Sequence, residues 1–271
     1  MKKLLILGLL TFLFLIVMVF LKNWFVRKMT YPAPWTFVPS PPPGNLQELT
    51  LKVKNNLHVS GWYEDTVDSD FFLLYFHGNG ENLAILGYSG LFEKLRQLNV
   101  NFLAIDYPGY GRSSGKPSET AIVQSGIAAV EWIANQYPDK RLVLCGWSLG
   151  AAAAIRTALQ KPERISALIA LSSWTSLPDV ENHHYPTWLV RSLVDEDWNT
   201  LEAAPQITIP VLLIHGEQDR IIPSSHGQKL AQTFPNLLIW KLIPQAGHND
   251  LLSYEEVWET IAQFLRKISI P

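Results

Sequence analysis

The chain has 271 residues, of which 48% are hydrophobic, and a formal net charge of −2. This composition suits a well-packed enzyme and argues against a protein that binds nucleic acid electrostatically. The one cysteine, Cys145, excludes an internal disulfide framework. We therefore expect the fold to depend on apolar packing, with Cys145 as a small core residue.

Residues 4–21 form an uncharged, strongly apolar run of about the length needed to cross a bilayer as a helix. A cleaved signal peptide is the alternative, but no small-residue cleavage site follows the run. We predict an uncleaved anchor within residues 1–28, and hence a single-pass membrane protein. Positive charges flank the run on both sides in nearly equal number, so the orientation in the membrane stays open.

A proline-rich segment, residues 29–45, follows the predicted anchor. Its composition disfavours a helix or an inner strand, and we expect a semi-extended spacer that carries the domain off the membrane. Trp35 and Phe37 within this spacer could dock onto the domain or into the membrane interface. The sequence leaves both alternatives open.

Residues 46–271 alternate between strand and helix patterns, which favours one α/β domain over two smaller ones. The alternating segments 49–54 and 57–63 predict an antiparallel hairpin. Six further strands are expected, because largely apolar runs typical of inner strands occur at 71–76, 100–105, 142–145, 165–171, 211–214 and 237–243. Helices are expected over 81–98, 118–136 and 151–159, and from about residue 253.

The strand at 142–145 leads into the turn Gly146-Trp-Ser148-Leu-Gly150, a G-x-S-x-G sequence. Its glycines remove Cβ atoms where strand and helix would otherwise collide. Such a turn exposes the Ser148 hydroxyl at the sheet edge, near the amino end of the next helix. A glycine-rich turn without chemistry is the alternative. The preceding strand and the following alanine-rich helix favour Ser148 as a nucleophile.

A serine hydroxyl becomes an effective nucleophile only when a base removes its proton and a carboxylate orients that base. Among seven histidines, His248 stands in a loop between the last strand and the last helix. His77 and His215 each end a strand just before a glycine, so we expect them to shape turns. Asp219 follows the strand at 211–214. The chain order Ser148, Asp219, His248 is the order of a hydrolase triad.

Four motifs together resemble the α/β-hydrolase fold, and within it the serine hydrolases that carry an N-terminal membrane anchor. The motifs are His77-Gly-Asn-Gly80, Asp106-Tyr-Pro-Gly-Tyr-Gly-Arg-Ser-Ser114, Gly146-Trp-Ser-Leu-Gly150, and the pair His215-Gly-Glu-Gln-Asp219 with Gly247-His-Asn-Asp250. The resemblance covers roughly residues 46–268. It implies a mostly parallel eight-stranded sheet with helices on both faces and a short lid at about 175–210.

The same resemblance assigns roles to individual residues. It implies that Ser148 is the nucleophile, that His248 is the general acid and base, and that Asp219 orients His248. It also implies an oxyanion hole formed by the backbone amides of Asn79 and Leu149. An oxyanion donor needs only a backbone amide, so the Asn79 side chain is expected to matter less than Ser148.

Two further motifs are interpreted as structural. The glycine-rich loop at 106–115 lacks the Lys-Ser/Thr of a phosphate-binding loop, and we expect Asp106 and Arg112 to fix its shape. His183 and His184 have no evident carboxylate or cysteine partner, so we expect neither a metal nor a cofactor. The segment after Trp174 is expected to wall the pocket through an apolar face of Trp188, Leu189, Leu193 and Val194.

Ester or thioester cleavage on a lipid-like or acylated substrate is the first functional expectation. The anchor would hold the site near lipid, and the resemblance includes acyl-lipid hydrolases and depalmitoylating thioesterases. The same triad serves some peptidases, so amide hydrolysis is the second expectation. A catalytically silent, membrane-tethered binding module is the third, although it would be expected to carry a degraded triad. No nucleic-acid partner is expected, and the sequence does not identify any protein partner.

Overall fold

The computed structural model describes residues 13, 26–28 and 30–269. The predicted anchor therefore lies outside the described residues, apart from Leu13 and the short piece at 26–28. Within the part that is described, none of the helices combines the length and apolar character needed to span a bilayer.

In the described residues, eight strands form one sheet in the order β1-β2-β4-β3-β5-β6-β7-β8. The first two pairings, β1 with β2 and β2 with β4, are antiparallel, and the remaining pairings are parallel. The strands are β1 (Gln47–Val53), β2 (Leu57–Glu64), β3 (Phe71–Phe76), β4 (Asn101–Ile105), β5 (Arg141–Trp147), β6 (Ala167–Leu171), β7 (Val211–Gly216) and β8 (Leu237–Ile243). The predicted hairpin and the mostly parallel sheet are thereby confirmed.

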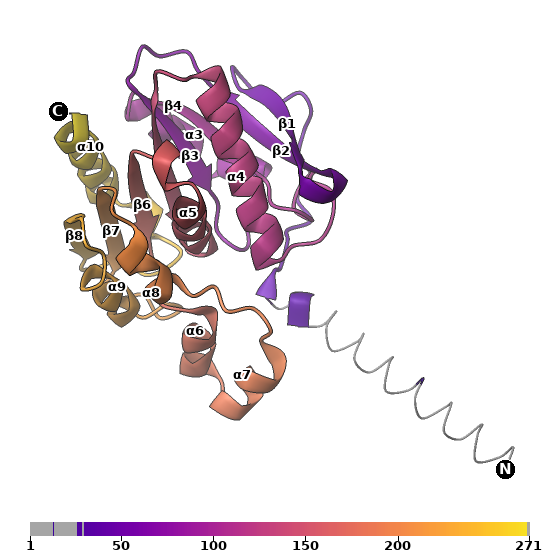
Figure 1. Ribbon diagram of the computed structural model, residues 1–271, viewed down its shortest axis with the longest axis vertical. Helices are drawn as coiled ribbons and strands as arrows, with labels where there is room; N and C mark the ends of the chain where they lie inside the picture. The colour runs from indigo at the N-terminus through magenta and orange to yellow at the C-terminus, as the bar shows by residue number, and fades with distance from the viewer. Residues whose placement is uncertain (1–12, 14–25, 29, 270–271) are drawn as a thin grey trace, which may run out of the picture.

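Helices cover both faces of the sheet (Figure 1). They are α2 (Leu83–Tyr88), α3 (Leu91–Gln97), α4 (Glu119–Gln136), α5 (Leu149–Gln160), α6 (Leu177–His184), α7 (Thr187–Leu193), α8 (Thr200–Ala203), α9 (Ser224–Ala231) and α10 (Glu255–Ser269). The single helix predicted over 81–98 is wrong, because the chain turns between α2 and α3. Gly90 at this turn has φ of 78°, in the left-handed region that ends a helix readily at glycine.

The two faces of the sheet bury two separate apolar clusters. In β3, Phe72, Leu74 and Phe76 pack with residues of α4, α5, α8 and α9. Their neighbours Leu73 and Tyr75 pack with residues of α2, α3 and α10 on the opposite face. Successive side chains of a strand point to opposite faces, so a run that is apolar throughout is what a strand between two helical layers requires.

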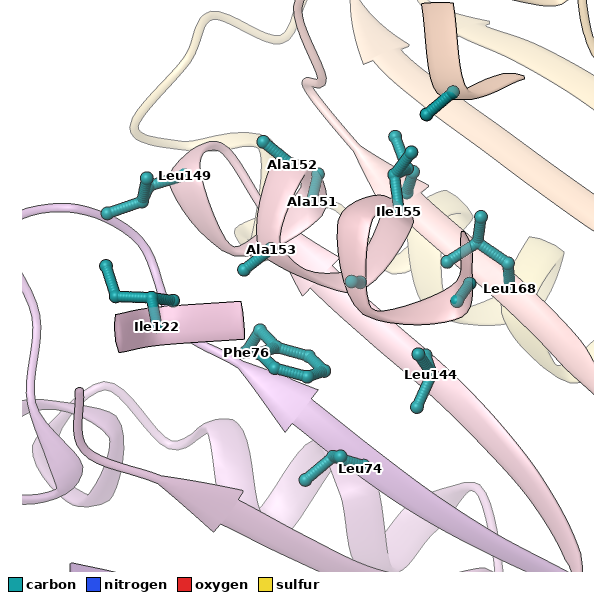
Figure 2. Packing of buried hydrophobic residues seen from close by; sticks show 14 of the residues in the cluster. Leu74, Phe76, Ile122, Leu144, Leu149, Ala151, Ala152, Ala153, Ile155 and Leu168 are labelled. Atoms are coloured by element: carbon teal, nitrogen blue, oxygen red, sulfur yellow. The ribbon is translucent and has the colours of Figure 1, made fainter. Parts of the chain in front are cut away.

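Helix α5 lies directly on the sheet, where Figure 2 shows Phe76, Leu144 and Leu168 beneath it. Residues 151–154 are four consecutive alanines with no exposed surface. Because alanine side chains are short, the helix axis approaches the strands closely. This contact fixes the amino end of α5, and with it the position of Ser148.

The strand order places two loops side by side at the carboxyl edge of the sheet. β3 lies between β4 and β5 in the sheet. The chain therefore continues from β3 to the strand on one side, β4, and later forms β5 on the other side. Ligands in open α/β sheets bind at such a switch point. The loop after β3, which contains Asn79, therefore lies near the turn after β5, which contains Ser148.

Residues 30–44, which we call the strap, lie on the domain instead of extending away from it as the spacer interpretation expects. Tyr31 and Val38 are buried, with 3% and 2% of their surfaces exposed. The side chain of Asn82 donates to the carbonyl of Thr36 at 2.9 Å. Trp35, by contrast, is 97% exposed. After Thr30 the strap has neither helix nor strand, as its prolines predict, but buried side chains and hydrogen bonds attach it to the domain.

The insertion between Trp174 and Pro210 folds into α6, α7 and α8. The buried residues Leu177 and Val180 of α6 and Val190 of α7 attach it to the domain. Trp188 is 72% exposed, so the expected apolar face of Trp188, Leu189, Leu193 and Val194 does not wall the pocket as a unit. In so short a helix, burying Val190 turns Trp188 toward solvent.

Candidate active site

The turn at Ser148 is held in a conformation that few residues adopt. Its φ and ψ are 57° and −120°, and its amide donates to the carbonyl of Leu171 at 2.9 Å. A Cβ atom on Gly146 would lie 2.0 Å from the carbonyl oxygen of Gly150, and one on Gly150 would lie 2.0 Å from that of Phe76. The two glycines are therefore required where β5, α5 and β3 meet.

The structure brings Ser148, His248 and Asp219 together from the ends of β5, β8 and β7. The Oγ atom of Ser148 lies 2.9 Å from Nε2 of His248, and Nδ1 of His248 lies 2.7 Å from Oδ2 of Asp219. An ionised carboxylate only accepts hydrogen bonds, so the proton of a neutral His248 sits on Nδ1. Nε2 is then free to accept the proton of the Ser148 hydroxyl. All three side chains are buried.

Asp219 is held in place by more than His248. Its Oδ1 atom accepts hydrogen bonds from the amides of Ile221 at 3.0 Å and Ile222 at 2.8 Å. Nε2 of His215 lies 3.4 Å from Oδ2 and donates to the carbonyl of Ile222 at 2.8 Å. Burial by itself would raise the pKa of Asp219, but the hydrogen bonds from His215, His248 and Ile222 outweigh it and hold the pKa well below its usual range. Asp219 is therefore ionised at neutral pH.

Comparison with known proteins identifies the fold family. Residues 72–193 and 195–253 match the family model described as the alpha/beta hydrolase fold. The chain belongs to the α/β-hydrolase fold family. The predicted family and sheet architecture are thus confirmed, whereas the roles of the individual site residues stay predictions.

Relatives of this hydrolase occur in bacteria and eukaryotes. It is 30% identical to the uncharacterised protein Rv2307c of Mycobacterium tuberculosis over 230 residues, which are 83% of this chain and 80% of the relative. It is 28% identical to the protein bem46 of Schizosaccharomyces pombe, over 86% of this chain and 81% of the relative. The α/β hydrolase domain-containing protein aho-3 of Caenorhabditis elegans is 31% identical, over 73% of this chain and 58% of the relative.

Solved structures show the same fold. The Pyrococcus furiosus esterase Pf2001 superposes with a TM-score of 0.70 at 24% identity, covering 87% of this chain and 98% of the esterase. Est1E of Butyrivibrio proteoclasticus, determined with bound ferulic acid, superposes with a TM-score of 0.68 at 18% identity, covering 82% of this chain and all of that chain. At these identities the likeness establishes the fold of the hydrolase domain.

Asn79 and Leu149 both border the pocket that contains Ser148 and His248. Leu149 is the first residue of α5, so no preceding helical turn offers its amide an acceptor. Among the described residues, neither this amide nor that of Asn79 donates to a protein acceptor. Both positions therefore suit donors to a developing oxyanion beside Ser148.

The side chain of Asn79 connects three separate segments. Its Nδ2 group donates to the carbonyl of Thr30 in the strap at 2.6 Å, and its Oδ1 atom accepts from the hydroxyl of Tyr110 at 2.8 Å. The next strap residue, Tyr31, donates its hydroxyl proton to Glu196 and accepts from Nε1 of Trp198 at 2.8 Å. The strap therefore joins the loop after β3 to the insertion at the edge of the site.

The pocket in front of Ser148 has a volume of about 250 Å³. Its apolar walls come from the turn after β5, the insertion and the loop after β7, and consist of Trp147, Leu149, Trp174, Leu177, Val180, Trp198, Ile221 and Ile222. Glu181 and Asn249 add polar groups, and Thr30 closes one side. A mostly apolar cleft with few polar groups is typical of a site for a small molecule or one segment of a larger one.

Sequence reasoning missed two features of this site. The indole ring of Trp147 lies beside the imidazole of His248, with ring centroids 5.2 Å apart and an angle of 34° between the planes. Trp147 is the variable position directly before Ser148, where a large aromatic residue is a usable signal. The second feature is Thr30, which lies outside the domain predicted to begin at residue 46.

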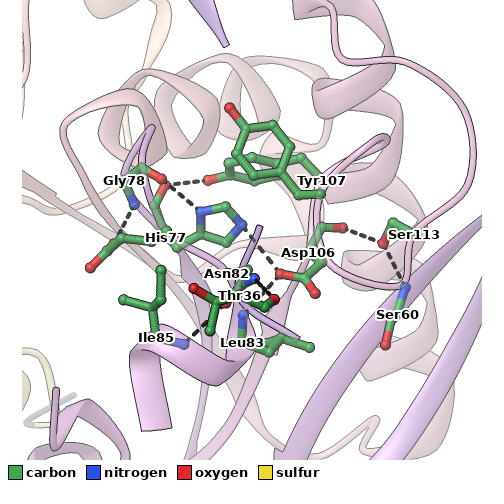
Figure 3. Close-up of polar contacts among 12 residues, drawn as sticks. Thr36, Ser60, His77, Gly78, Asn82, Leu83, Ile85, Asp106, Tyr107 and Ser113 are labelled. Atoms are coloured by element: carbon green, nitrogen blue, oxygen red, sulfur yellow. Dashed lines mark hydrogen bonds and ion pairs between the residues drawn. The ribbon is translucent and has the colours of Figure 1, made fainter. Parts of the chain in front are cut away.

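Behind the loop after β3, His77 and Asp106 form a buried polar pair (Figure 3). Nε2 of His77 lies 3.6 Å from Oδ1 of Asp106, and both side chains are fully buried. Oδ1 also accepts from the amide of Leu83 at 2.9 Å, and the Ser113 hydroxyl donates to the Asp106 carbonyl at 2.9 Å. Asp106 thus fixes its loop, in agreement with the sequence interpretation. Arg112 does so from the surface, through Glu48 at 2.6 Å.

Burial raises the pKa of Asp106 to about 7, although backbone hydrogen bonds oppose the shift. Because this pKa lies above the unfolded value of 3.8, the folded state binds the proton more tightly. The contribution of this proton to the free energy of unfolding is fully present below pH 3.8 and is lost as the pH rises through 7. Between pH 5 and pH 8, this one group should lower the free energy of unfolding by about 2–3 kcal/mol.

Asp106→Asn is expected to remove this pH-dependent loss. Denaturant unfolding at pH 5 and pH 8, followed by circular dichroism, measures it. The asparagine substitution also changes the free energy of unfolding at both pH values for reasons unrelated to titration. The informative quantity is therefore the difference in free energy of unfolding between variant and wild type at pH 8, compared with the same difference at pH 5. Asp68→Asn, at an exposed position, is the matched control. Equal differences from wild type at pH 5 and pH 8 for Asp106→Asn would contradict the assignment.

Proposed function

We propose that this chain is a membrane-anchored serine hydrolase that cleaves carboxylic ester or thioester bonds through an acyl-enzyme intermediate. The observation that carries the proposal is the continuous hydrogen-bonded series from Ser148 through His248 to Asp219, which opens into an apolar pocket. This arrangement supplies a nucleophile, a base and an orienting carboxylate in the geometry that acyl transfer requires.

In the acylation step, Oγ of Ser148 attacks the carbonyl carbon of the substrate while Nε2 of His248 takes the hydroxyl proton. Asp219 stabilises the resulting imidazolium and keeps its orientation. The amides of Leu149 and Asn79 donate to the oxyanion of the tetrahedral intermediate. When this intermediate collapses, the bond to the leaving group breaks, and His248 returns the proton to the leaving oxygen or sulfur.

In the deacylation step, a water molecule takes the place of the leaving group. His248 removes a proton from the water as its oxygen attacks the acyl carbon bound to Ser148. The second tetrahedral intermediate then expels Ser148, which regains its proton from His248. The carboxylic acid leaves, and the site returns to its starting state.

Three observations favour acyl substrates with an apolar chain. The pocket walls are mostly apolar, with Leu177 and Val180 of the insertion acting as a short lid. The Pyrococcus furiosus structure named above belongs to a protein described as an esterase. The apolar run at residues 4–21 would hold the site next to lipid. Together they support an ester or thioester of a lipid-like or acylated molecule.

Labelling of the detergent-solubilised full chain with a fluorophosphonate tests the proposed function. We expect stoichiometric labelling that Ser148→Ala abolishes, followed by turnover of p-nitrophenyl acyl esters that rises with acyl chain length. Aminoacyl amides measured beside the esters separate the peptidase alternative, which requires measurable turnover of the amides as well as of the esters. A correctly folded protein that neither labels nor hydrolyses an ester would instead be a binding module.

A further inference from the structure

Most of the exposed large apolar side chains lie on the three segments that contribute residues to the walls of the Ser148 pocket. In the described part of the chain, seven large hydrophobic side chains are exposed. Five of them lie on the strap, on the insertion or in the loop after β7, and we call these five the rim surface: Trp35, Phe37, Tyr185, Trp188 and Ile221. Single exposed apolar residues are ordinary on a protein, whereas a group around one opening indicates an interaction surface.

The strap, the insertion and the loop after β7 meet at the same opening. Thr30 and Ile221 both line the Ser148 pocket. A second pocket of about 120 Å³ lies between the start of the strap and the insertion, and Thr30 and Leu177 belong to the walls of both pockets. Nε2 of His184 donates to the carbonyl of Ile221 at 2.8 Å, which joins the insertion to the third segment. In Figure 1, α6 and α7 project from the end of the domain near which the strap begins.

Chain length restricts the distance between this opening and a membrane. The apolar run ends at Leu21, nine residue steps before Thr30. Nine residues span at most about 32 Å when fully extended and about 14 Å when helical. The headgroup layer on each side of the hydrocarbon core is about 5–8 Å thick. An anchor that ends at Leu21 therefore keeps Thr30, at the edge of the pocket, within about 32 Å of the hydrocarbon core, a distance that includes the headgroup layer.

Basic side chains that suit a lipid headgroup layer lie just before the strap and on α7. Arg27 and Lys28 are exposed just before the strap, and Arg191 is exposed on α7. Nζ of Lys28 lies 5.9 Å from the centroid of the Trp35 ring, so a cation and an exposed indole stand side by side. Tryptophan and tyrosine rings are enriched at the level of lipid headgroups, and basic side chains are attracted to anionic lipids.

We propose that the rim surface docks onto the headgroup layer of the membrane that holds the anchor, so that the Ser148 pocket receives its substrate from that layer. The inference rests on the proposed function for the identity of the reaction, but the docking itself does not depend on catalysis. It assigns Trp35 and Trp188 to contact with lipid, which accounts for their 97% and 72% exposure. The alternative, in which Trp35 packs onto the domain, does not account for this exposure.

Fluorescence quenching tests docking without using activity. The full chain is reconstituted into vesicles of phosphatidylcholine with one quarter phosphatidylglycerol, with or without phosphatidylcholine brominated in its acyl chains near the headgroup. The double variant Trp35→Ser/Trp188→Ser is compared with wild type, so that the difference in emission reports these two rings. We expect brominated lipid to lower this difference emission by at least twofold. A difference emission that brominated lipid leaves unchanged would overturn the proposal.

Turnover tests the functional part of the proposal. We expect the double variant to hydrolyse a vesicle-embedded long-chain umbelliferyl ester at least tenfold more slowly than wild type. It should retain the wild-type kcat/KM, within twofold, for p-nitrophenyl butyrate in detergent. Tyr88→Ser is the matched control, because Tyr88 is a 79% exposed aromatic residue that borders neither pocket. This control should behave as wild type in both assays.

Equal loss on the embedded and the soluble ester would overturn the proposal, because the variant would then have damaged the site itself. A dimeric wild type and a monomeric double variant in detergent would also overturn the proposal. The rim surface would then contact a second copy of the chain instead of lipid. If wild type fails to hydrolyse even the soluble ester, the proposed function fails, while the quenching result still decides whether the rim surface meets lipid.

Discussion

Ser148→Ala and His248→Ala are each expected to lower kcat for a soluble acyl ester by about 10⁶-fold, which is about 8 kcal/mol of transition-state stabilisation. Ser148 contributes the attacking oxygen, and His248 is the base 2.9 Å from it. Neither role has a substitute among the other polar groups of the pocket walls. Steady-state kinetics with p-nitrophenyl butyrate measures the loss, and circular dichroism checks that each variant is folded.

The double variant Ser148→Ala/His248→Ala should be no slower than either single variant, because residues that act as a unit lose their function together. Asp219→Asn is expected to cost less, about 10⁴-fold, since it changes the orientation and tautomer of His248 but leaves the base present. An Asp219→Asn enzyme with full ester turnover would overturn the assignment of Asp219.

Ser172→Ala is a matched control for the loss of Ser148. Ser172 also follows a parallel strand, is fully buried and has a positive φ of 46°. It lacks the flanking glycines and does not border the pocket. We expect its alanine variant to retain activity within a few-fold of wild type. A loss comparable to that of Ser148→Ala would mean that the measurement reports general damage to the sheet edge.

Gly150→Ala is expected to destabilise the domain by about 3 kcal/mol or to prevent folding. The added Cβ atom would lie 2.0 Å from the carbonyl oxygen of Phe76 and 2.7 Å from that of His77. Both neighbours are backbone atoms of the sheet and the loop after it, so relief requires the separation of α5 from β3. For a domain of this size the corresponding fall in Tm is about 6–12 °C, measured by thermal unfolding.

Gly80→Ala provides the comparison for this prediction. Gly80 lies in the neighbouring loop, and a Cβ atom placed on it meets no atom within 4 Å. Its alanine variant should unfold within about 0.5 kcal/mol of wild type. If both glycine variants were equally stable, the close approach of α5 to β3 would not be what makes Gly150 necessary.

Much of the site was predictable because its requirements are local or follow from chain order. The two glycines around Ser148 are readable in the sequence because a Cβ atom at either position meets backbone within a few residues or in the adjacent strand. Strands apolar throughout imply a sheet covered on both faces, which the two clusters around β3 confirm. The carboxyl ends of parallel strands lie along one edge, so the residues after β5, β7 and β8 lie at the same edge, and their loops bring them together across the end of β6.

Other features depended on partners that sequence patterns do not reveal. The strap looked like a free spacer because proline-rich composition describes its backbone and not its contacts. Its attachment comes from Tyr31 bonding to Glu196 and Trp198, more than 160 residues away. The direction of Trp188 was likewise undetermined, since α7 is too short for its periodicity to specify a buried face.

The sequence by itself determined the hydrolase fold, the turn at Ser148 and the order of the three residues predicted to act together, since sterics and strand periodicity act over short distances. Only the tertiary structure decided that Trp147 lies against His248, that Thr30 walls the pocket and that Trp35 points away from the domain. These are contacts or exposures between segments far apart in the chain. They depend on how whole layers pack, which no local pattern encodes.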